Sequence, residues 1–142
     1  MMTNLFLKHK KSRLLFFFSI LFLGIPLGWS QSVLVLTYHR FGNELFPSTN
    51  IRMDQFEEHI KKLKSKNYEF LKASEIPDRL QLEESEHPLA AITIDDAFQS
   101  LYTNAWPILK KHQIPFTVFV SSQKIDDKRP AYLTWDQLHE MM

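Results

Sequence analysis

Two kinds of hydrophobic pattern alternate along the chain. Continuous apolar runs rich in β-branched residues predict strands buried on both faces, and they lie at 33–39, 68–71, 90–94 and 116–120. Apolar residues at helical spacing predict helices at about 54–67, 100–112 and from 134 onward, with a shorter one starting near Ser74. Alternating strands and helices favour right-handed crossovers. The pattern therefore predicts an α/β fold with mainly parallel strands.

Three local signals refine these helices. Asp54 with Glu57, and Thr134 with Gln137, have the spacing of a capping box, in which the first side chain accepts from a backbone N–H of the first turn. Pro107 lies inside the helix predicted at 100–112, where its missing N–H removes one backbone bond. We therefore expect helix starts at Asp54 and Thr134 and a bend near Pro107.

The first 30 residues have a different pattern from the rest. Four basic residues between Lys8 and Arg13 precede an apolar stretch at 14–24, and Gly28 and Ser30 provide small residues after it. This order is typical of a secretory signal peptide, so we expect residues 1–30 to be removed and 31–142 to form the working domain. The alternative is an uncleaved signal anchor, although the apolar run is shorter than the roughly 20 residues of a membrane span.

Charge and composition narrow the choice of partners. Removal of residues 1–30 would take four of the 17 basic residues and none of the 16 acidic ones, which leaves a net charge of −3. An acidic chain argues against nucleic acid as a partner. The chain contains no cysteine, which excludes disulfides and thiolate chemistry. We expect an exported protein of the periplasm, cell envelope or extracellular space, with membrane contact only through the signal segment.

The most informative polar residues are Asp95 and Asp96, which directly follow the apolar run at 90–94. Adjacent carboxylates at the end of a buried strand repel each other unless a cation lies beside them or one takes a proton. The carboxyl ends of parallel strands are also where α/β proteins place their chemistry. We therefore take the pair as the candidate site. Tyr38 and His39, at the end of the first predicted strand, are possible further lining residues.

The residues around this pair resemble a known family. The segments that carry the resemblance are Ala91–Phe98, Ala105–Lys111, Ile114–Val120 and Leu133–Leu138, together with Tyr38-His39-Arg40. They are similar to the first catalytic block and its flanks in NodB-homology polysaccharide deacetylases, carbohydrate esterase family 4. The upstream part is similar to the exported branch that acts on poly-N-acetylglucosamine.

This resemblance implies a fold, an activity and site roles. The fold would be the N-terminal part of an irregular (β/α) barrel, and the reaction would be metal-dependent removal of N-acetyl groups from an N-acetylated polysaccharide. Asp95 would be the general base and Asp96 a metal ligand, with zinc, or else cobalt, nickel or manganese, as the cofactor. A divalent cation lowers the pKa of bound water, and a carboxylate beside the metal can take the proton of that water.

The chain departs from the family pattern in two respects. Ala97 stands where the family has glycine after the aspartate pair, which would be costly if the turn requires positive φ. The family's His-x-x-x-His pair is missing, since none of the six histidines are four apart. We therefore expect the chain to be inactive on its own, with a non-catalytic glycan-binding protein or a truncated remnant as the alternative. A magnesium-binding receiver domain fits less well, because its acidic pair lies on the first strand.

Overall fold

The computed structural model describes residues 32–81 and 85–142. The predicted signal peptide lies outside these residues. No helix within the two described ranges is both long enough and apolar enough to cross a membrane.

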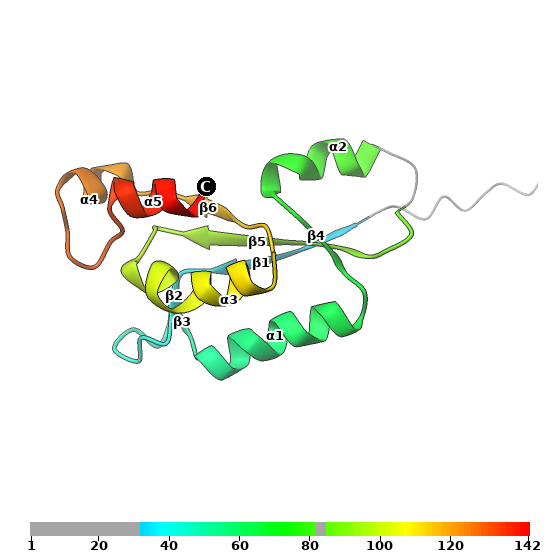
Figure 1. Cartoon of the computed structure of the whole chain (residues 1–142), viewed down its shortest axis with the longest axis horizontal. Helices are drawn as coiled ribbons and strands as arrows, with labels where there is room; N and C mark the ends of the chain where they lie inside the picture. Colours follow the sequence, from blue (N-terminus) through cyan, green and yellow to red (C-terminus); the bar gives the residue numbers. More distant parts are fainter. Residues whose placement is uncertain (1–31, 82–84) are drawn as a thin grey trace, which may run out of the picture.

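One parallel sheet organises the molecule, as the sequence pattern predicts. Its central strand β5 (Leu89–Asp95) pairs along one edge with β1 (Val33–Tyr38), in a register from Val33↔Leu89 to Tyr38↔Ile94. The other edge of β5 is shared. Strand β4 (Glu69–Leu71) pairs with its first half and β6 (Thr117–Phe119) with its second half. Figure 1 shows β1, β5 and β6 running in the same direction.

The central position of β5 explains its apolar sequence. Every residue from Leu89 to Ile94 is buried, including Thr93, whose hydroxyl hydrogen-bonds to that of Thr37 on β1 at 2.9 Å. A strand flanked on both edges and covered on both faces has no solvent-facing side, so continuous hydrophobicity replaces alternation. This rigid strand ends at the aspartate pair.

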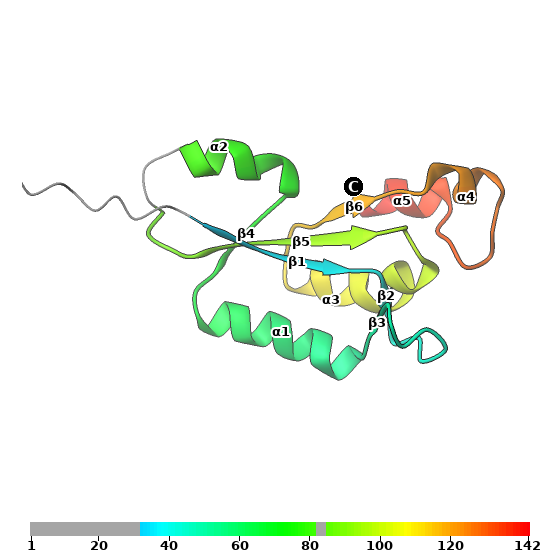
Figure 2. The same ribbon diagram turned by 180° about the vertical axis from the view of Figure 1, so that it is seen from behind.

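Helices cover the sheet from both sides. They are α1 (Met53–Ser65), α2 (Ile76–Gln81) after the 3₁₀ turn η1 (Ala73–Glu75), α3 (Trp106–Lys111) after the π-helical turn η2 (Leu101–Ala105), α4 (Ser122–Asp126) and α5 (Trp135–Met141). Helices α1 and α2 lie on opposite sides of the sheet (Figures 1 and 2). Buried residues of α1, η2, α3 and β5 form one core, which contains Phe56, Ile60, Leu101, Leu109 and Ile92.

Pro107 shapes the helix in which it lies. The Trp106 N–H donates to the carbonyl of Leu101, five residues back, so the chain before the proline is wound as a π-helix. A wider turn at this point accommodates a residue that lacks its own N–H. The structure thus has a π-helical turn directly before the point at which the sequence predicts a bend, and Pro107 lies in the first turn of α3.

One local prediction was wrong, and one feature was not predicted. Helix α1 begins after Arg52 without a side-chain cap, and Asp54 instead forms an ion pair with Arg52, in which Nη2 and Oδ2 are 2.8 Å apart. Two short strands on either side of the loop at 42–49, β2 (Arg40–Phe41) and β3 (Asn50–Ile51), were not predicted. Two-residue strands leave no periodic hydrophobic signal, which is why the pattern missed them.

Candidate functional site

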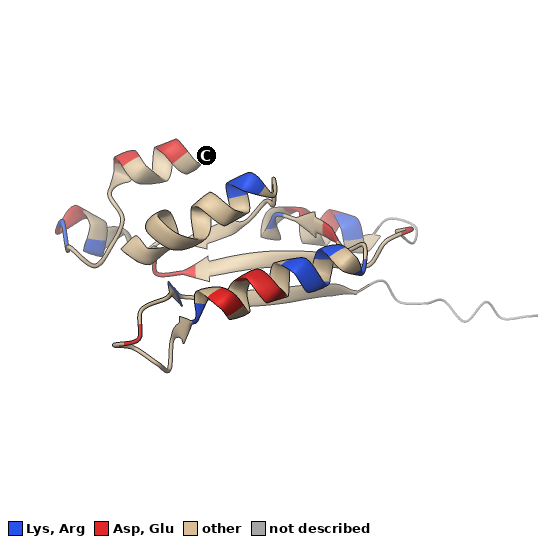
Figure 3. Cartoon of the chain, turned by 60° about the horizontal axis from the view of Figure 1, so that its bottom comes forward, with Lys and Arg blue, Asp and Glu red and all other residues tan. Residues whose placement is uncertain are grey.

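The acidic pair lies at the carboxyl end of the central strand, at the turn into the following helix. Asp95 is the last residue of β5, and Asp96 and Ala97 follow with φ values of 69° and 57°. Figure 3 shows the acidic segment at the tip of the β5 arrow. Two consecutive left-handed residues reverse the chain sharply. This turn places the two neighbouring carboxylates in different surroundings.

Asp95 lies beside the histidine that follows β1. His39 Nε2 is 3.6 Å from Asp95 Oδ2, and both side chains are about one-third exposed. The parallel pairing of β1 with β5 brings these two strand ends together, since Tyr38 is paired with Ile94 one residue earlier. The structure therefore joins two of the predicted site residues.

Asp96 is held by a residue from the next strand connection. The Ser121 hydroxyl donates to Asp96 Oδ1 at 3.1 Å. Ser121 lies just after β6, which pairs with the end of β5. The hydrogen bond orients the carboxylate and leaves its second oxygen for other partners. Sequence reasoning did not identify Ser121, because its role depends on the β5–β6 register.

Tyr38 faces away from the aspartates. Its hydroxyl hydrogen-bonds to His59 Nδ1 on α1 at 2.8 Å, and its ring packs against Phe41 and Phe56. Burial raises the pKa of the Tyr38 hydroxyl to about 12. Successive side chains of a strand point to opposite faces, so Tyr38 enters the core while His39 turns to the site.

Arg40 is a further residue at this end of the sheet that sequence reasoning did not single out. Its guanidinium carbon is 3.5 Å from the ring centroid of Phe98 and 4.3 Å from that of Phe46. Nη1 also donates to the Thr49 hydroxyl at 2.6 Å. A planar cation between two aromatic rings connects the 42–50 segment to the turn after β5. The stack thereby fixes the chain next to His39.

The donors at this edge suit a divalent metal by type but are too few. Carboxylate oxygen and imidazole nitrogen are typical zinc ligands, and a stable site uses at least three. Within the part of the chain that the structure describes, no three His, Cys, Asp or Glu side chains are grouped so that they could hold a metal ion. Asp95, Asp96 and His39 therefore do not form a complete metal site by themselves.

Comparison with known proteins identifies the family. A family model described as polysaccharide deacetylase matches residues 83–142, which include the aspartate pair. Residues 83–142 are thus part of a polysaccharide deacetylase domain. The chain is 30% identical over 112 residues to the poly-beta-1,6-N-acetyl-D-glucosamine N-deacetylase of Staphylococcus aureus, in a match that covers 69% of this chain and 39% of that protein.

Solved structures of deacetylases have the same fold. The Streptococcus pyogenes deacetylase PplD, in complex with acetate, superposes with a TM-score of 0.68 at 26% identity, over 77% of this chain and 51% of that one. IcaB from Ammonifex degensii gives the same TM-score at 29% identity, over 78% and 49%. The fold therefore corresponds to part of a NodB-type (β/α) barrel. The chain spans 39% of its Staphylococcus aureus relative and about half of these two structures.

Proposed function

We propose that this polysaccharide deacetylase chain supplies the base and one metal ligand of a metal-dependent enzyme that removes acetyl groups from an N-acetylhexosamine polysaccharide. The observation that carries the proposal is the pair Asp95 and Asp96 at the end of β5, inside the segment that matches the family. His39 beside Asp95 and Ser121 on Asp96 give the two carboxylates separate partners. Because the two carboxylates have different neighbours, one can act as the base and the other as the metal ligand.

Asp95 is suited to the role of general base. It lies at an exposed strand end where a water molecule and an acetamido group can approach, and a charged carboxylate can accept a proton from that water. The water oxygen would then bond to the acetyl carbon, and the proton that Asp95 took would pass to the nitrogen as the carbon–nitrogen bond breaks. The products are acetate and a free amino sugar. His39, whose Nε2 lies 3.6 Å from Asp95 Oδ2, would help to orient the Asp95 carboxylate.

Asp96 is proposed as the metal ligand of this chain, with Ser121 fixing its orientation. Zinc is the first choice of metal, and cobalt, nickel or manganese are the alternatives. Because the described donors are incomplete, we propose that this chain alone binds metal weakly and has no turnover. Its place of action would be the periplasm, the cell envelope or the extracellular space.

A chimera tests these roles. Residues 33–142 would replace the matching segment of the Staphylococcus aureus deacetylase, and acetate release from poly-β-1,6-N-acetylglucosamine would be measured. We expect Asp95→Asn to abolish turnover while the protein keeps its zinc, and Asp96→Asn to lower the zinc content itself. His87→Gln, on a loop away from the site, is the matched control. Full activity of the Asp95→Asn chimera would show that Asp95 is not the base.

The incomplete set of ligands favours a second candidate, a non-catalytic glycan-binding protein. This candidate predicts that the chain alone binds N-acetylglucosamine oligomers and keeps that binding after chelation. The enzyme proposal predicts no turnover by the chain alone with zinc or cobalt. Robust activity of the chain alone that Asp95→Asn abolishes would contradict the expectation that it is inactive.

A further inference from the structure

The contact between His39 and Asp95 lies just beyond the pairing of their two strands. The β1–β5 ladder ends at the pair Tyr38↔Ile94, one residue before each member of the contact. The 3.6 Å between His39 Nε2 and Asp95 Oδ2 is therefore not fixed by that ladder alone. The short strand β2, which follows His39 directly, provides a second support.

The backbone of Phe41, the second residue of β2, is bound by two side chains. Its N–H donates to the Ser100 hydroxyl at 3.1 Å, and its carbonyl accepts from Asn104 Nδ2 at 2.7 Å. Because β2 pairs with β3 along one edge, Ser100 and Asn104 take the place of a neighbouring strand along the other. We call these two side chains, with their hydrogen bonds to Phe41, the Phe41 clamp.

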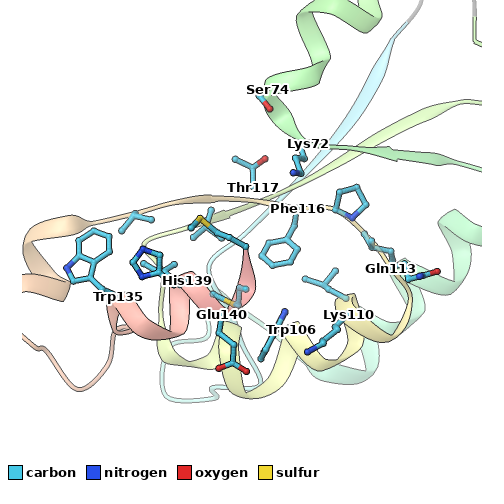
Figure 4. Close-up of a pocket in the computed structure, with 18 residues that line it drawn as sticks. Lys72, Ser74, Trp106, Lys110, Gln113, Phe116, Thr117, Trp135, His139 and Glu140 are labelled. Carbon is cyan, nitrogen blue, oxygen red and sulfur yellow. The ribbon is translucent and has the colours of Figure 1, made fainter.

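The clamp comes from the helical segment that directly follows the acidic pair. Ser100 and Asn104 are four residues apart and project from the same side of this segment. Asn104 lies in the π-helical turn η2, a rare geometry that is frequent at functional sites. Trp106, two residues further, instead lines the pocket drawn in Figure 4. The clamp thus connects the chain after Asp96 to the chain after His39.

Close packing beside the clamp restricts movement of β2. Phe41 is fully buried, and Gly42 after it has a φ of 67°. A Cβ at Gly42 would lie 3.4 Å from Asn104 Nδ2 and 3.1 Å from Met53 Cγ. The backbone at 41–42 therefore fits closely between its neighbours, two residues from His39.

We propose that Ser100 and Asn104 are positioning residues, which hold His39 beside Asp95 through the backbone of Phe41. The placement of His39 rests on the geometry of the clamp. The consequence for deacetylation rests on the proposed function, in which His39 orients the Asp95 carboxylate. Loss of the clamp then displaces His39 and leaves the base poorly oriented for the chemical step.

The same two hydrogen bonds also stabilise the fold, because they satisfy the backbone groups of a buried residue. A loss of stability would therefore not distinguish a positioning role from a structural one. The distinguishing property is the surroundings of the His39 ring in the folded protein.

Nuclear magnetic resonance of the full chain measures this property. The ring signals of His39 are identified by their disappearance in His39→Gln. We expect these signals to shift in Asn104→Asp, which replaces the donor by an oxygen of the same shape, and in Ser100→Ala. Thr103→Ala is the matched control, because the exposed Thr103 hydroxyl donates to the Gln99 carbonyl within its own helical segment. Circular dichroism verifies that each variant is folded.

Unchanged His39 signals in both clamp variants, or equal shifts in Thr103→Ala, would overturn the proposal. Kinetics of the chimera with the Staphylococcus aureus deacetylase measure the consequence for the reaction. We expect either clamp variant to lower kcat by about tenfold to a hundredfold and to leave KM nearly unchanged, because a misplaced base hinders the chemical step rather than binding. A wild-type chimera without turnover, together with shifted His39 signals in the clamp variants of the full chain, would contradict the proposed function and support the clamp.

Discussion

Ala97 has a left-handed backbone conformation beside the site. It is fully buried with φ at 57°, directly after Asp96 at 69°. A left-handed conformation costs a residue with a Cβ about 1–2 kcal/mol. Its methyl group regains about 0.8 kcal/mol by burial. The turn thus keeps its shape with a residue that is poorly suited to it.

Substitutions at Ala97 should separate these two effects. Ala97→Gly relieves strain but loses the buried methyl and makes the unfolded chain more flexible, so we expect the free energy of unfolding to change by less than about 1 kcal/mol. Ala97→Val should destabilise by about 2–4 kcal/mol, because a β-branched residue is both strained and overpacked there. Urea denaturation measures the free energy of unfolding of both variants. A neutral Ala97→Val would show that the turn is not left-handed in solution.

Arg40 gives a second prediction at the level of the residue. Replacement of its guanidinium by the ammonium of Arg40→Lys keeps the charge but loses the planar stack between Phe46 and Phe98. We expect a loss of about 0.5–2 kcal/mol in stability. Arg129→Lys is the control, since Arg129 forms an exposed ion pair. Equal stability of Arg40→Lys and the wild type would show that the stack contributes nothing.

At the level of the element, the sequence predicts long periodic segments well and short irregular ones poorly. The apolar run at 90–94 and the helical spacing of Phe56, Ile60 and Leu63 both gave elements of the correct type. The capping box was confirmed at Thr134, where Gln137 N–H donates to the hydroxyl at 3.2 Å. The same spacing at Asp54 failed because Arg52 pairs with its carboxylate. Spacing alone does not reveal this competition.

The candidate site was predictable only in those residues that hydrophobic runs locate. Asp95 and Asp96 mark a strand end that the apolar run locates, and His39 marks another. Ser121 and the Arg40 stack depend on strand register and on the path of the 42–50 segment. Hydrophobic periodicity carries no information on either. The sequence thus located the two carboxylates and His39, but not Ser121 or the Arg40 stack.

The ion pair between β4 and α2 predicts a dependence on pH. Arg79 donates to both Glu69 oxygens, at 2.6 and 2.7 Å, and this hydrogen-bonded pairing lowers the pKa of Glu69 below its ordinary value of 4.5. A lowered folded-state pKa stabilises the protein above the unfolded value, and this stability is lost as the pH falls through the folded value. The stability difference between wild type and Glu69→Gln should therefore shrink below pH 4.5.

Denaturation between pH 3 and pH 7, roughly the range in which glutamates titrate, measures this difference. Glu57→Gln is the control, because Glu57 pairs with Lys61 on the exposed face of α1 at 3.7 Å. A stability difference between wild type and Glu69→Gln that stays constant over this pH range would show that Glu69 and Arg79 do not form their ion pair in solution.

At the scale of the whole molecule, the pattern of the N-terminal segment predicts that the chain is exported. Residues 1–30 carry four basic residues and no acidic one, so their removal changes the net charge from +1 to −3. Expression of the full chain in a bacterial host should release a protein that begins at Gln31, because small residues at Gly28 and Ser30 suit cleavage after Ser30. Mass spectrometry of the exported protein measures the new terminus. The substitution Ser30→Trp places a bulky residue directly before the predicted cleavage site and should block processing. Ser32→Trp, which lies beyond that cleavage site, is the control. An intact N-terminus on wild-type protein in the membrane fraction would instead favour the uncleaved signal anchor.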